Sequence, residues 1–369
     1  MPRKKAPEVR PEGTVPEDLV DLPPPAPAGR WSPDVLGDGF EARTIPLLED
    51  DEGEVVATLV RHVPADDPGA FHETPSSPSF AVLYLHGWND YFYNRDVARR
   101  WSQLGGAFYA LDLRKYGRSL RPHQTRGYVE SLSTYDEDLH EALKVIRREQ
   151  GVRTDLVLMG HSTGGLTAAL WAHRHPGALR ALVLNAPWLE LQHSALLRGV
   201  AQPIIARLAR TQPKAVIPTS DPGFYQRTLT GWTDEDGPLP EGQEDDPFVT
   251  GWEPHPAWRI VGAPIRAGWL SAVLAGHAQV AAGLDIDCPV LVMTAAKTII
   301  TATKWSPQLR EVDVVLDVTW IRRRVHLLGG HVTLVRLDGA IHDVMLSSRR
   351  VRDRAHAELA RWARTYVLR

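Results

Sequence analysis

The sequence predicts an α/β fold, with a mostly parallel, doubly wound sheet and an inserted helical cap. Apolar runs of strand length alternate with segments of helical periodicity along most of the chain, which is typical of a parallel sheet covered by helices. The alternation stops at about residue 190 and resumes at about 288, which indicates extra structure inserted into the sheet. We therefore expect a core formed by residues 36–189 and 286–369, and a cap over residues 190–285.

The composition is that of a globular protein. The chain has 369 residues, of which 43% are hydrophobic and 24% charged. A formal net charge of −3 argues against a generic nucleic-acid-binding protein, which would carry a strongly basic domain. The apolar runs are shorter than the roughly 18 to 20 residues that cross a bilayer, so we expect no transmembrane helix. The single cysteine, Cys288, excludes an intrachain disulfide, and the first residues lack the apolar segment of a secretory signal. We expect a cytoplasmic protein.

The N-terminal segment, residues 1–35, differs from the rest of the chain. Eight prolines fall within the first 30 residues. Proline removes a backbone donor and is disfavoured inside helices and sheets. The segment is therefore expected to form a proline-rich, flexible arm.

The elements of the core follow in order. Two alternating segments, FEARTIPL and VVATLVRHV, flank an acidic turn and predict an antiparallel hairpin. Continuous apolar runs then predict strands that are buried on both faces. These runs lie at 80–87, 107–113, 155–162, 179–187 and 288–295, with a weaker one at 331–339. Helices are predicted over 95–104, 132–148, 164–175 and the C-terminal segment 349–368.

The inserted block, residues 190–285, is expected to be mainly helical. Apolar helical runs cover 191–209 and 263–282. Between them lies an acidic loop at 233–246, rich in proline and glycine, with seven acidic residues and no basic one. A block of this kind usually packs over one end of an α/β sheet.

The segment VLMGHSTGG carries the strongest chemical signal. Gly160, Ser162 and Gly164 form G-x-S-x-G directly after a predicted strand and before a predicted helix, the context of a nucleophile elbow. Glycines let the backbone pass through such a sharp turn without Cβ clashes. The turn would expose the Ser162 hydroxyl at the carboxyl end of the sheet. We therefore expect Ser162 to be a catalytic nucleophile.

A serine nucleophile needs a base and an acid that orients the base. His342 follows the last predicted strand and is expected to be the base. The acid must precede it, and the candidates after the strand at 288–295 are Asp313 and Asp317. Asp317 could instead cap the helix that begins near residue 318. Both aspartates remain open on this reasoning, with Asp313 favoured.

An oxyanion hole needs two backbone N–H groups. One is expected from Thr163, which follows the nucleophile, and the other from Trp88, in the loop after the strand at 80–87. His86 in the same loop is expected to hold the loop in place and not to act as a second base.

Other ligand classes find little support in the sequence. His173 and His175 are two residues apart, so they cannot share one face of a helix as metal ligands. No Gly-rich phosphate loop is present, and we expect no metal and no organic cofactor. The C-terminal helix carries six arginines, but membrane contact is expected to be at most peripheral. The oligomeric state is not indicated.

Five motifs together resemble the α/β-hydrolase fold over roughly residues 40–366. They are LYLHGW, LDLRKYGRSL, VLMGHSTGG, LVLNAPWLEL and GAIHDVMLS. Within this fold they are most similar to the monoacylglycerol lipase and lysophospholipase branch, which is grouped with serine aminopeptidases. The resemblance implies Ser162 as nucleophile, His342 as base, and the amides of Trp88 and Thr163 as oxyanion donors.

Two departures from the family pattern stand out. Lys115 occupies a position in LDLRKYGRS where the family usually has glycine. The family's acid usually follows the strand at 288–295 within a few residues, whereas here residues 296–312 intervene before Asp313. The separation from His342 is 29 residues for Asp313 and 25 for Asp317, and the family's spacing favours Asp313.

The resemblance implies a serine hydrolase that cleaves carboxylic esters through an acyl-enzyme on Ser162. An apolar helical cap suggests acyl or lipid-like esters of small molecules, such as monoacylglycerols or lysophospholipids. Two alternatives remain open. An aminopeptidase or amidase of the same fold would hydrolyse aminoacyl amides, and a non-catalytic protein on this fold would only bind a ligand.

Overall fold

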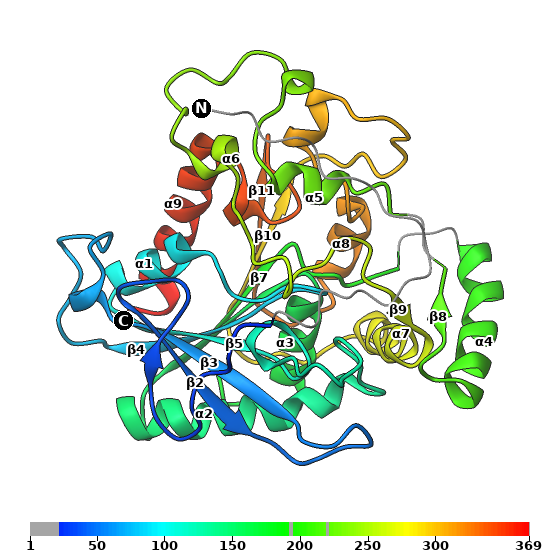
Figure 1. The fold of residues 1–369 in the computed structure, drawn as a ribbon, viewed down its shortest axis with the longest axis horizontal. Coiled ribbons are helices and arrows are strands. Elements are labelled where there is room, and N and C mark those ends of the chain that lie inside the picture. The colour runs from blue at the N-terminus through cyan, green and yellow to red at the C-terminus, as the bar shows by residue number, and fades with distance from the viewer. Residues whose placement is uncertain (1–21, 192–194, 219–220, 369) are drawn as a thin grey trace.

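The computed structural model describes residues 22–191, 195–218 and 221–368. Within these residues the central element is a nine-stranded sheet with the order β1-β2-β3-β5-β4-β6-β7-β10-β11 (Figure 1). Its strands are β1 (Ser32–Pro33), β2 (Phe40–Pro46), β3 (Val56–His62), β4 (Phe80–Leu85), β5 (Gly106–Asp112), β6 (Leu156–His161), β7 (Ala181–Asn185), β10 (Val290–Ala295) and β11 (Val332–Leu337). Every pairing from β5 across to β11 is parallel, so the predicted fold class is confirmed.

The apolar character of the strands explains their place in the sheet. Every residue of β4, β5, β6, β7 and β10 is buried, as expected of strands that are covered on both faces. β11 is mostly half-buried and forms the edge of the sheet, which matches its weaker apolar run. The predicted hairpin is formed by β2 and β3, which pair antiparallel.

The N-terminal segment is described from Leu22 onward, so residues 1–21 of the expected arm lie outside the described residues. The described part is attached to the sheet. Ser32 and Pro33 pair with β2 as the edge strand β1, where a proline costs no ladder hydrogen bond. Next to this strand, Asp34 accepts two hydrogen bonds from the guanidinium of Arg118 at 2.7 and 2.8 Å.

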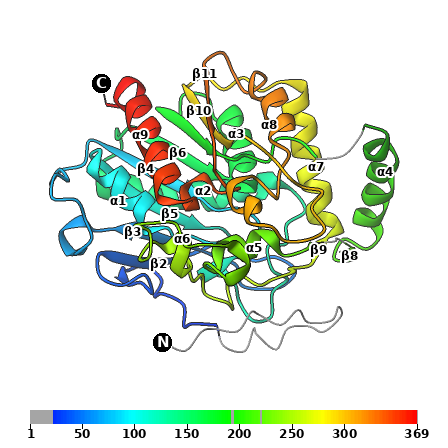
Figure 2. The ribbon, with the colours of Figure 1, turned by 90° about the horizontal axis from the view of Figure 1, so that it is seen from above.

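Helices cover both faces of the sheet. They are α1 (Arg95–Gln103), α2 (Tyr135–Gln150), α3 (Thr163–Arg174), α8 (Val318–Val325) and α9 (Arg349–Tyr366). α1 and α9 lie side by side on one face, joined by ion pairs of 3.8 Å from Arg100 to Asp353 and from Arg352 to Asp96 (Figures 1 and 2). α2 lies on the opposite face (Figure 1). The arrangement is the predicted doubly wound one.

The inserted segment contains several short elements besides its helices. They are α4 (Ala195–Thr211), β8 (Val216–Ile217), α5 (Phe224–Leu229), α6 (Pro247–Thr250), β9 (Ile265–Arg266) and α7 (Ala267–Ala282). α4 lies at the edge of the molecule, beyond α7 (Figures 1 and 2). α7 is different, because its residues Trp269, Val273 and Val280 belong to the same hydrophobic core as the sheet.

The acidic loop at 233–246 is held by arginines from the core. Asp236 pairs with Arg310 at 2.9 Å, and Asp246 pairs with Arg352 of α9 at 2.8 Å. Both carboxylates are buried, which explains why these two acids of the loop need cationic partners. No helix in the described ranges is both long and apolar enough to span a membrane.

Candidate active site

Ser162 lies in the tight turn between β6 and α3. Its backbone has φ 52° and ψ −116°, a strained conformation for a residue other than glycine. A Cβ at Gly160 would lie 2.5 Å from the carbonyl oxygen of Gly164, and a Cβ at Gly164 would lie 2.2 Å from that of His86. Neither position has room for a side chain. The glycines of G-x-S-x-G therefore let the turn close against the loop after β4.

Three side chains from distant parts of the chain form a line of hydrogen bonds. The Oγ of Ser162 lies 3.1 Å from Nε2 of His342, and Nδ1 of His342 lies 2.9 Å from a carboxylate oxygen of Asp313. Their exposed fractions are 8%, 2% and 0%, so water is largely kept from these bonds. Since a carboxylate can only accept, Nδ1 carries the imidazole proton and Nε2 is left to accept the serine hydroxyl.

The two candidate acids have different surroundings. The second oxygen of Asp313 accepts the backbone N–H groups of Val315 and Leu316 at 2.8 and 2.7 Å, so the carboxylate is fixed from both sides. Asp317 is the N-cap of α8 and accepts the N–H of Thr319 at 2.8 Å. The structure thus brings Asp313 to His342 and leaves Asp317 in the capping position that the sequence offered as its alternative.

The expected oxyanion donors lie beside the serine. Thr163 is the first residue of α3, so its N–H has no acceptor within its own helix. Trp88 follows Gly87, where an added Cβ would lie 3.2 Å from Cβ of Ser162. His86 fixes this loop, because Nδ1 donates to the carbonyl of Gly87 at 2.8 Å and Nε2 accepts the N–H of Leu113 at 3.0 Å. Burial lowers the pKa of His86, which keeps it neutral in this role.

A second histidine lies against the first. The ring of His161 lies 4.9 Å from that of His342, and its Nδ1 lies 3.2 Å from the carbonyl oxygen of Asn185. Burial lowers the pKa of His161 to about 4. At neutral pH His161 is therefore uncharged and does not oppose the protonation of His342.

The sequence did not single out a polar cluster next to His342. The ring of Tyr225, from α5, lies 5.3 Å from the ring of His342, and the guanidinium of Arg259 lies over Tyr225 at 5.2 Å. Arg259 pairs with Asp90 at 3.5 Å, and burial raises the pKa of Asp90 to about 7. The hydroxyls of Tyr93 and Tyr225 are buried without a partner among the described residues. Asp90 and Tyr93 follow the HGW motif in the loop after β4, whereas Tyr225 and Arg259 come from the inserted segment, so only the tertiary fold brings these residues together.

Aromatic rings line the other side of the loop that bears Trp88. Trp88 lies 3.9 Å from Trp269 of α7 and 5.9 Å from Tyr116, measured between ring centroids. Trp188 lies 6.3 Å from Trp269. Within the described residues, no group of three or more His, Cys, Asp or Glu side chains is arranged to hold a metal ion.

Lys115 stands where the family usually has glycine, and its backbone keeps the conformation that glycine favours. Lys115 has φ 63°, in the left-handed region. Its side chain is 1% exposed, and its ammonium pairs with Asp50 at 2.6 Å and Glu52 at 2.7 Å. These ion pairs offset the strain and join the loop after β5 to the turn of the β2–β3 hairpin.

Comparison with known proteins agrees with this geometry. The family model described as "Serine aminopeptidase, S33" matches residues 76–346, a span that contains Ser162, Asp313 and His342. The monoacylglycerol lipase of Mycolicibacterium smegmatis is 32% identical over 140 residues, which are 37% of this chain and 48% of that enzyme. The match therefore spans about half the length of this curated relative.

Solved structures show the same fold. The monoacylglycerol lipase of Paleococcus ferrophilus superposes with a TM-score of 0.53 at 19% identity, covering 79% of this chain and 96% of that one. A soluble variant of the monoglyceride lipase of Saccharomyces cerevisiae gives a TM-score of 0.56 at 13% identity, covering 87% and 94%. The predicted α/β-hydrolase fold is confirmed.

Proposed function

The chain belongs to the hydrolase family described as "Serine aminopeptidase, S33", and from this premise we propose that it is a serine hydrolase that cleaves carboxylic esters. The observation that carries the proposal is the line of hydrogen bonds from Ser162 through His342 to Asp313. A serine hydroxyl is a weak nucleophile until an adjacent base removes its proton. This arrangement supplies the base and a carboxylate that orients it.

The proposed reaction has two halves. The Oγ of Ser162 attacks the ester carbonyl carbon while its proton moves to Nε2 of His342. The tetrahedral intermediate collapses, His342 gives the proton to the leaving alcohol oxygen, and an acyl-enzyme remains. Water then attacks the acyl carbon with His342 again as base, the bond from that carbon to Oγ breaks, His342 returns the proton to Oγ, and the carboxylic acid is released. Asp313 stabilises the imidazolium and keeps its proton on Nδ1 throughout.

We propose the backbone amides of Trp88 and Thr163 as the oxyanion donors. The position of Thr163 at the start of α3 supports this, because the helix dipole places partial positive charge there. The contact between Gly87 and Ser162 supports it for the loop that bears Trp88. Donors of this kind typically contribute about 10²–10³-fold to the rate.

The surroundings of the serine support an acyl ester with a polar alcohol portion. The half-buried rings of Trp88 and Trp188 offer apolar surface for an acyl chain, and the buried ring of Trp269 packs behind them. The unpartnered hydroxyl of Tyr225, whose ring lies 5.3 Å from that of His342, offers a hydrogen bond to a hydroxylated leaving group. The relatives named above are monoacylglycerol or monoglyceride lipases, which also favours such an ester. We propose monoacylglycerol- or lysophospholipid-like substrates.

Hydrolysis of aminoacyl amides is the second candidate, because the family description names aminopeptidases. A peptidase for free N-termini needs a carboxylate that is available to the substrate ammonium. Two buried carboxylates lie near Tyr225: Asp90 is paired with Arg259 at 3.5 Å, and Asp343 accepts the side-chain amide of Asn185 at 2.6 Å, so neither is free for a substrate ammonium. These pairings favour an uncharged ester substrate over an amine.

We also propose a cytoplasmic location and at most peripheral contact with membranes. The lone cysteine, Cys288, is buried and free, as is usual in a reducing compartment.

Labelling with a fluorophosphonate probe tests the proposed chemistry. Wild-type protein should react at one serine, and Ser162→Ala and His342→Ala should abolish the reaction. Asp313→Asn should slow it by about 10³-fold or more, because the amide favours the wrong imidazole tautomer. Asp317→Asn is the matched control and should label like wild type, since asparagine also caps helices. A folded wild-type protein that does not label would exclude a serine hydrolase.

A substrate panel then separates ester from amide chemistry. Medium- and long-chain acyl esters of glycerol should be turned over, and aminoacyl amides should not. Turnover of a short aryl ester alone would contradict the lipid-like substrate class. Preferential turnover of aminoacyl amides would contradict the esterase proposal and favour an amidase.

A further inference from the structure

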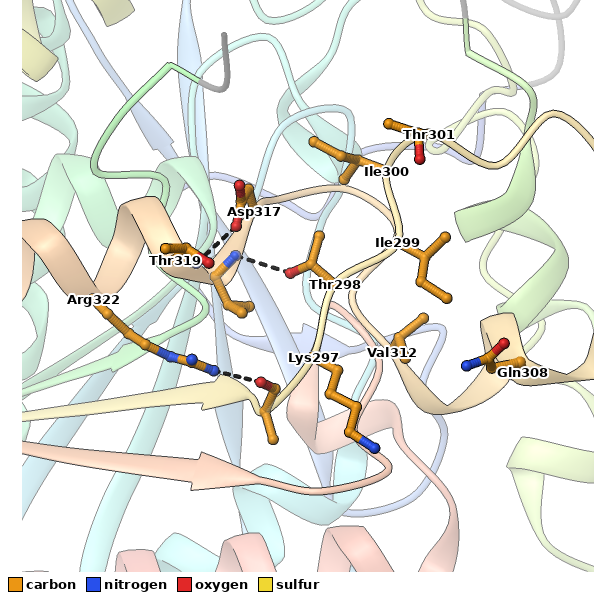
Figure 3. A pocket seen from close by; sticks show the side chains of 12 residues that line it. Lys297, Thr298, Ile299, Ile300, Thr301, Gln308, Val312, Asp317, Thr319 and Arg322 are labelled. Carbon is orange, nitrogen blue, oxygen red and sulfur yellow. Dashed lines mark hydrogen bonds between the residues drawn. The ribbon is translucent and has the colours of Figure 1, made fainter. Parts of the chain in front are cut away.

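A pocket of about 620 Å³ lies next to the proposed active site but does not include it. It is formed by residues 296–301, which follow β10, by the first turns of α8, and by Gln308 and Val312 (Figure 3). None of Ser162, Asp313 and His342 lines it. Its volume is within the range of about 300–1,000 Å³ that is usual for small-molecule sites, and it is open to solvent on one side.

The walls of this pocket combine aliphatic and cationic groups. Ile299, Ile300 and Val312 supply aliphatic surface, while Lys297 and Arg322 supply two positive charges. Arg322 donates to the carbonyls of Ala295 and Ala296, but its buried Nε has no partner among the described residues. Lys297 is exposed, and no carboxylate in the described part of the chain pairs with its ammonium.

The one carboxylate of the pocket does not cancel these charges. Asp317 uses an oxygen to cap α8 through the N–H of Thr319 at 2.8 Å (Figure 3). The lining of the pocket therefore carries two cations and one carboxylate that is already engaged. Arg336 adds further positive charge nearby. Burial is the main cause of a lowered pKa of Arg322, and the charge of Arg336 is the second cause. An occupant with a negative head and an aliphatic body suits such a pocket better than a neutral or cationic one.

The pocket wall is also hydrogen-bonded to the backbone of the proposed triad acid. Asp313 donates its N–H to the carbonyl of Lys297, and its own carbonyl accepts the N–H of Ile299, both at 3.0 Å. Thr298 accepts the N–H of Val318 at 3.0 Å (Figure 3), and it donates to the carbonyl of Leu316 at 3.1 Å. A shift of residues 297–299 would therefore move Asp313 relative to Nδ1 of His342.

From these contacts we propose that the pocket is a second binding site, which takes a small aliphatic carboxylate and transmits its occupancy to Asp313. The segment that builds it, residues 296–312, is the same one that separates the strand from the acid and departs from the family pattern. A carboxylate is also what the proposed hydrolysis releases. The regulatory half of the inference thus rests on the proposed function, whereas binding itself does not.

Calorimetric titration of the full chain with octanoate tests the binding. Octanoate should bind the wild type, and Lys297→Gln and Arg322→Gln should each weaken that binding about tenfold or more. Arg323→Gln is the matched control, because Arg323 is adjacent on α8 but exposed, over Trp320 at 4.6 Å, and outside the pocket. Equal affinity in the wild type, Lys297→Gln and Arg322→Gln would place the ligand elsewhere and overturn the proposal, as would no binding to the wild type. 1-Octanol lacks the charge, so its affinity should be the same for the wild type and for Lys297→Gln.

The rate of fluorophosphonate labelling at Ser162 tests the transmission. Octanoate should change this rate in the wild type and in Arg323→Gln, and Lys297→Gln should need about tenfold more octanoate for the same change. A rate that octanoate alters equally in all three proteins would indicate competition at the active site and refute the second site. If the wild type does not label at all, the proposed function fails, while the titrations still decide whether the pocket binds.

Discussion

The side-chain amide of Asn185 donates a hydrogen bond of 2.6 Å to the carboxylate of Asp343, the residue that follows His342. The amide oxygen of Asn185 accepts the N–H of Val344 at 3.2 Å, and its backbone carbonyl accepts the N–H of Ser162 at 3.0 Å. One fully buried residue at the end of β7 thus holds both the serine turn and the histidine loop.

Asn185→Ala should impair the proposed chemistry more than binding. Without the amide, the histidine loop loses two hydrogen bonds, and His342 loses its fixed position relative to Ser162. We expect kcat on an acyl ester to fall about 10–100-fold with little change in KM, since small misplacements of catalytic groups are costly. Gln124→Ala is the control, because Gln124 is a buried amide bonded to the carbonyl of Glu54, outside the site. Equal kcat values in the two variants would contradict this role for Asn185.

Gly164→Ala should disrupt the serine turn. The added Cβ would lie 2.2 Å from the carbonyl oxygen of His86, and backbone cannot move aside as a side chain can. We expect loss of fluorophosphonate labelling and a free energy of unfolding lowered by about 1–3 kcal/mol, measured by urea denaturation. Gly330→Ala, where a Cβ would meet nothing within 4 Å, should change neither quantity. Normal labelling of Gly164→Ala would show that the turn adapts.

His356→Phe should reduce the sensitivity of the fold to acid. Burial, together with Arg100 and Arg352, lowers the pKa of His356 to about 3, and both ring nitrogens lack partners among the described residues. The unfolded chain therefore binds this proton below the ordinary histidine pKa of 6.5, whereas the folded chain stays unprotonated until about pH 3, so stability falls as pH falls from about 6.5 toward 3. Between about pH 7.5 and pH 5, the free energy of unfolding, measured by urea denaturation, should fall by about 2 kcal/mol more in wild type than in the variant. The exposed His72→Phe is the control, and a variant that loses stability as steeply as wild type would refute the assignment.

Glu52→Gln should weaken the tie between the hairpin turn and the inserted segment. Glu52 bonds Lys115 at 2.7 Å and Lys214 at 2.9 Å. Burial acts to raise its pKa, but the bonds from Lys115, Thr125 and Lys214 outweigh burial and lower the pKa to about 2. At neutral pH we expect a loss of about 1–3 kcal/mol in free energy of unfolding.

The pH dependence of that loss gives a second check. A lowered carboxyl pKa stabilises the fold above the ordinary value of 4.5, and this contribution disappears as pH falls through about 2. The difference between wild type and Glu52→Gln should shrink over that window. The exposed Glu54→Gln should match wild type throughout, and a difference that stays constant in acid would show that charge is not the cause.

The parallel sheet and the serine turn could be predicted because their signals are local. A strand buried on both faces must be apolar along its whole length, as β6 is, and the turn after it needs glycine at positions 160 and 164. The stripe of Val351, Ala355, Leu359 and Trp362 on the last helix is likewise buried as its periodicity predicts.

The acid and the polar cluster could not be fixed in the same way. Asp313 and Asp317 differ in sequence by four positions, and only the path of the chain through residues 296–312 brings one of them to His342. Tyr225 and Arg259 come from the inserted segment, where no periodic pattern says which side chain faces the site. Contacts between segments far apart in the chain depend on loop paths, which local sequence does not encode.

Arg310 links two regions whose separation would be costly. It lies three residues before Asp313 and is 1% exposed, between the rings of Trp232 and Trp305. Its guanidinium donates to carbonyls of the inserted segment and pairs with Asp236. Separating the two regions would take the buried guanidinium of Arg310 away from its partners, at a cost of about 3–5 kcal/mol. A conformer opened there would account for less than about one molecule in a hundred at equilibrium, so Arg310 holds the inserted segment against the chain that leads to Asp313 in nearly all molecules.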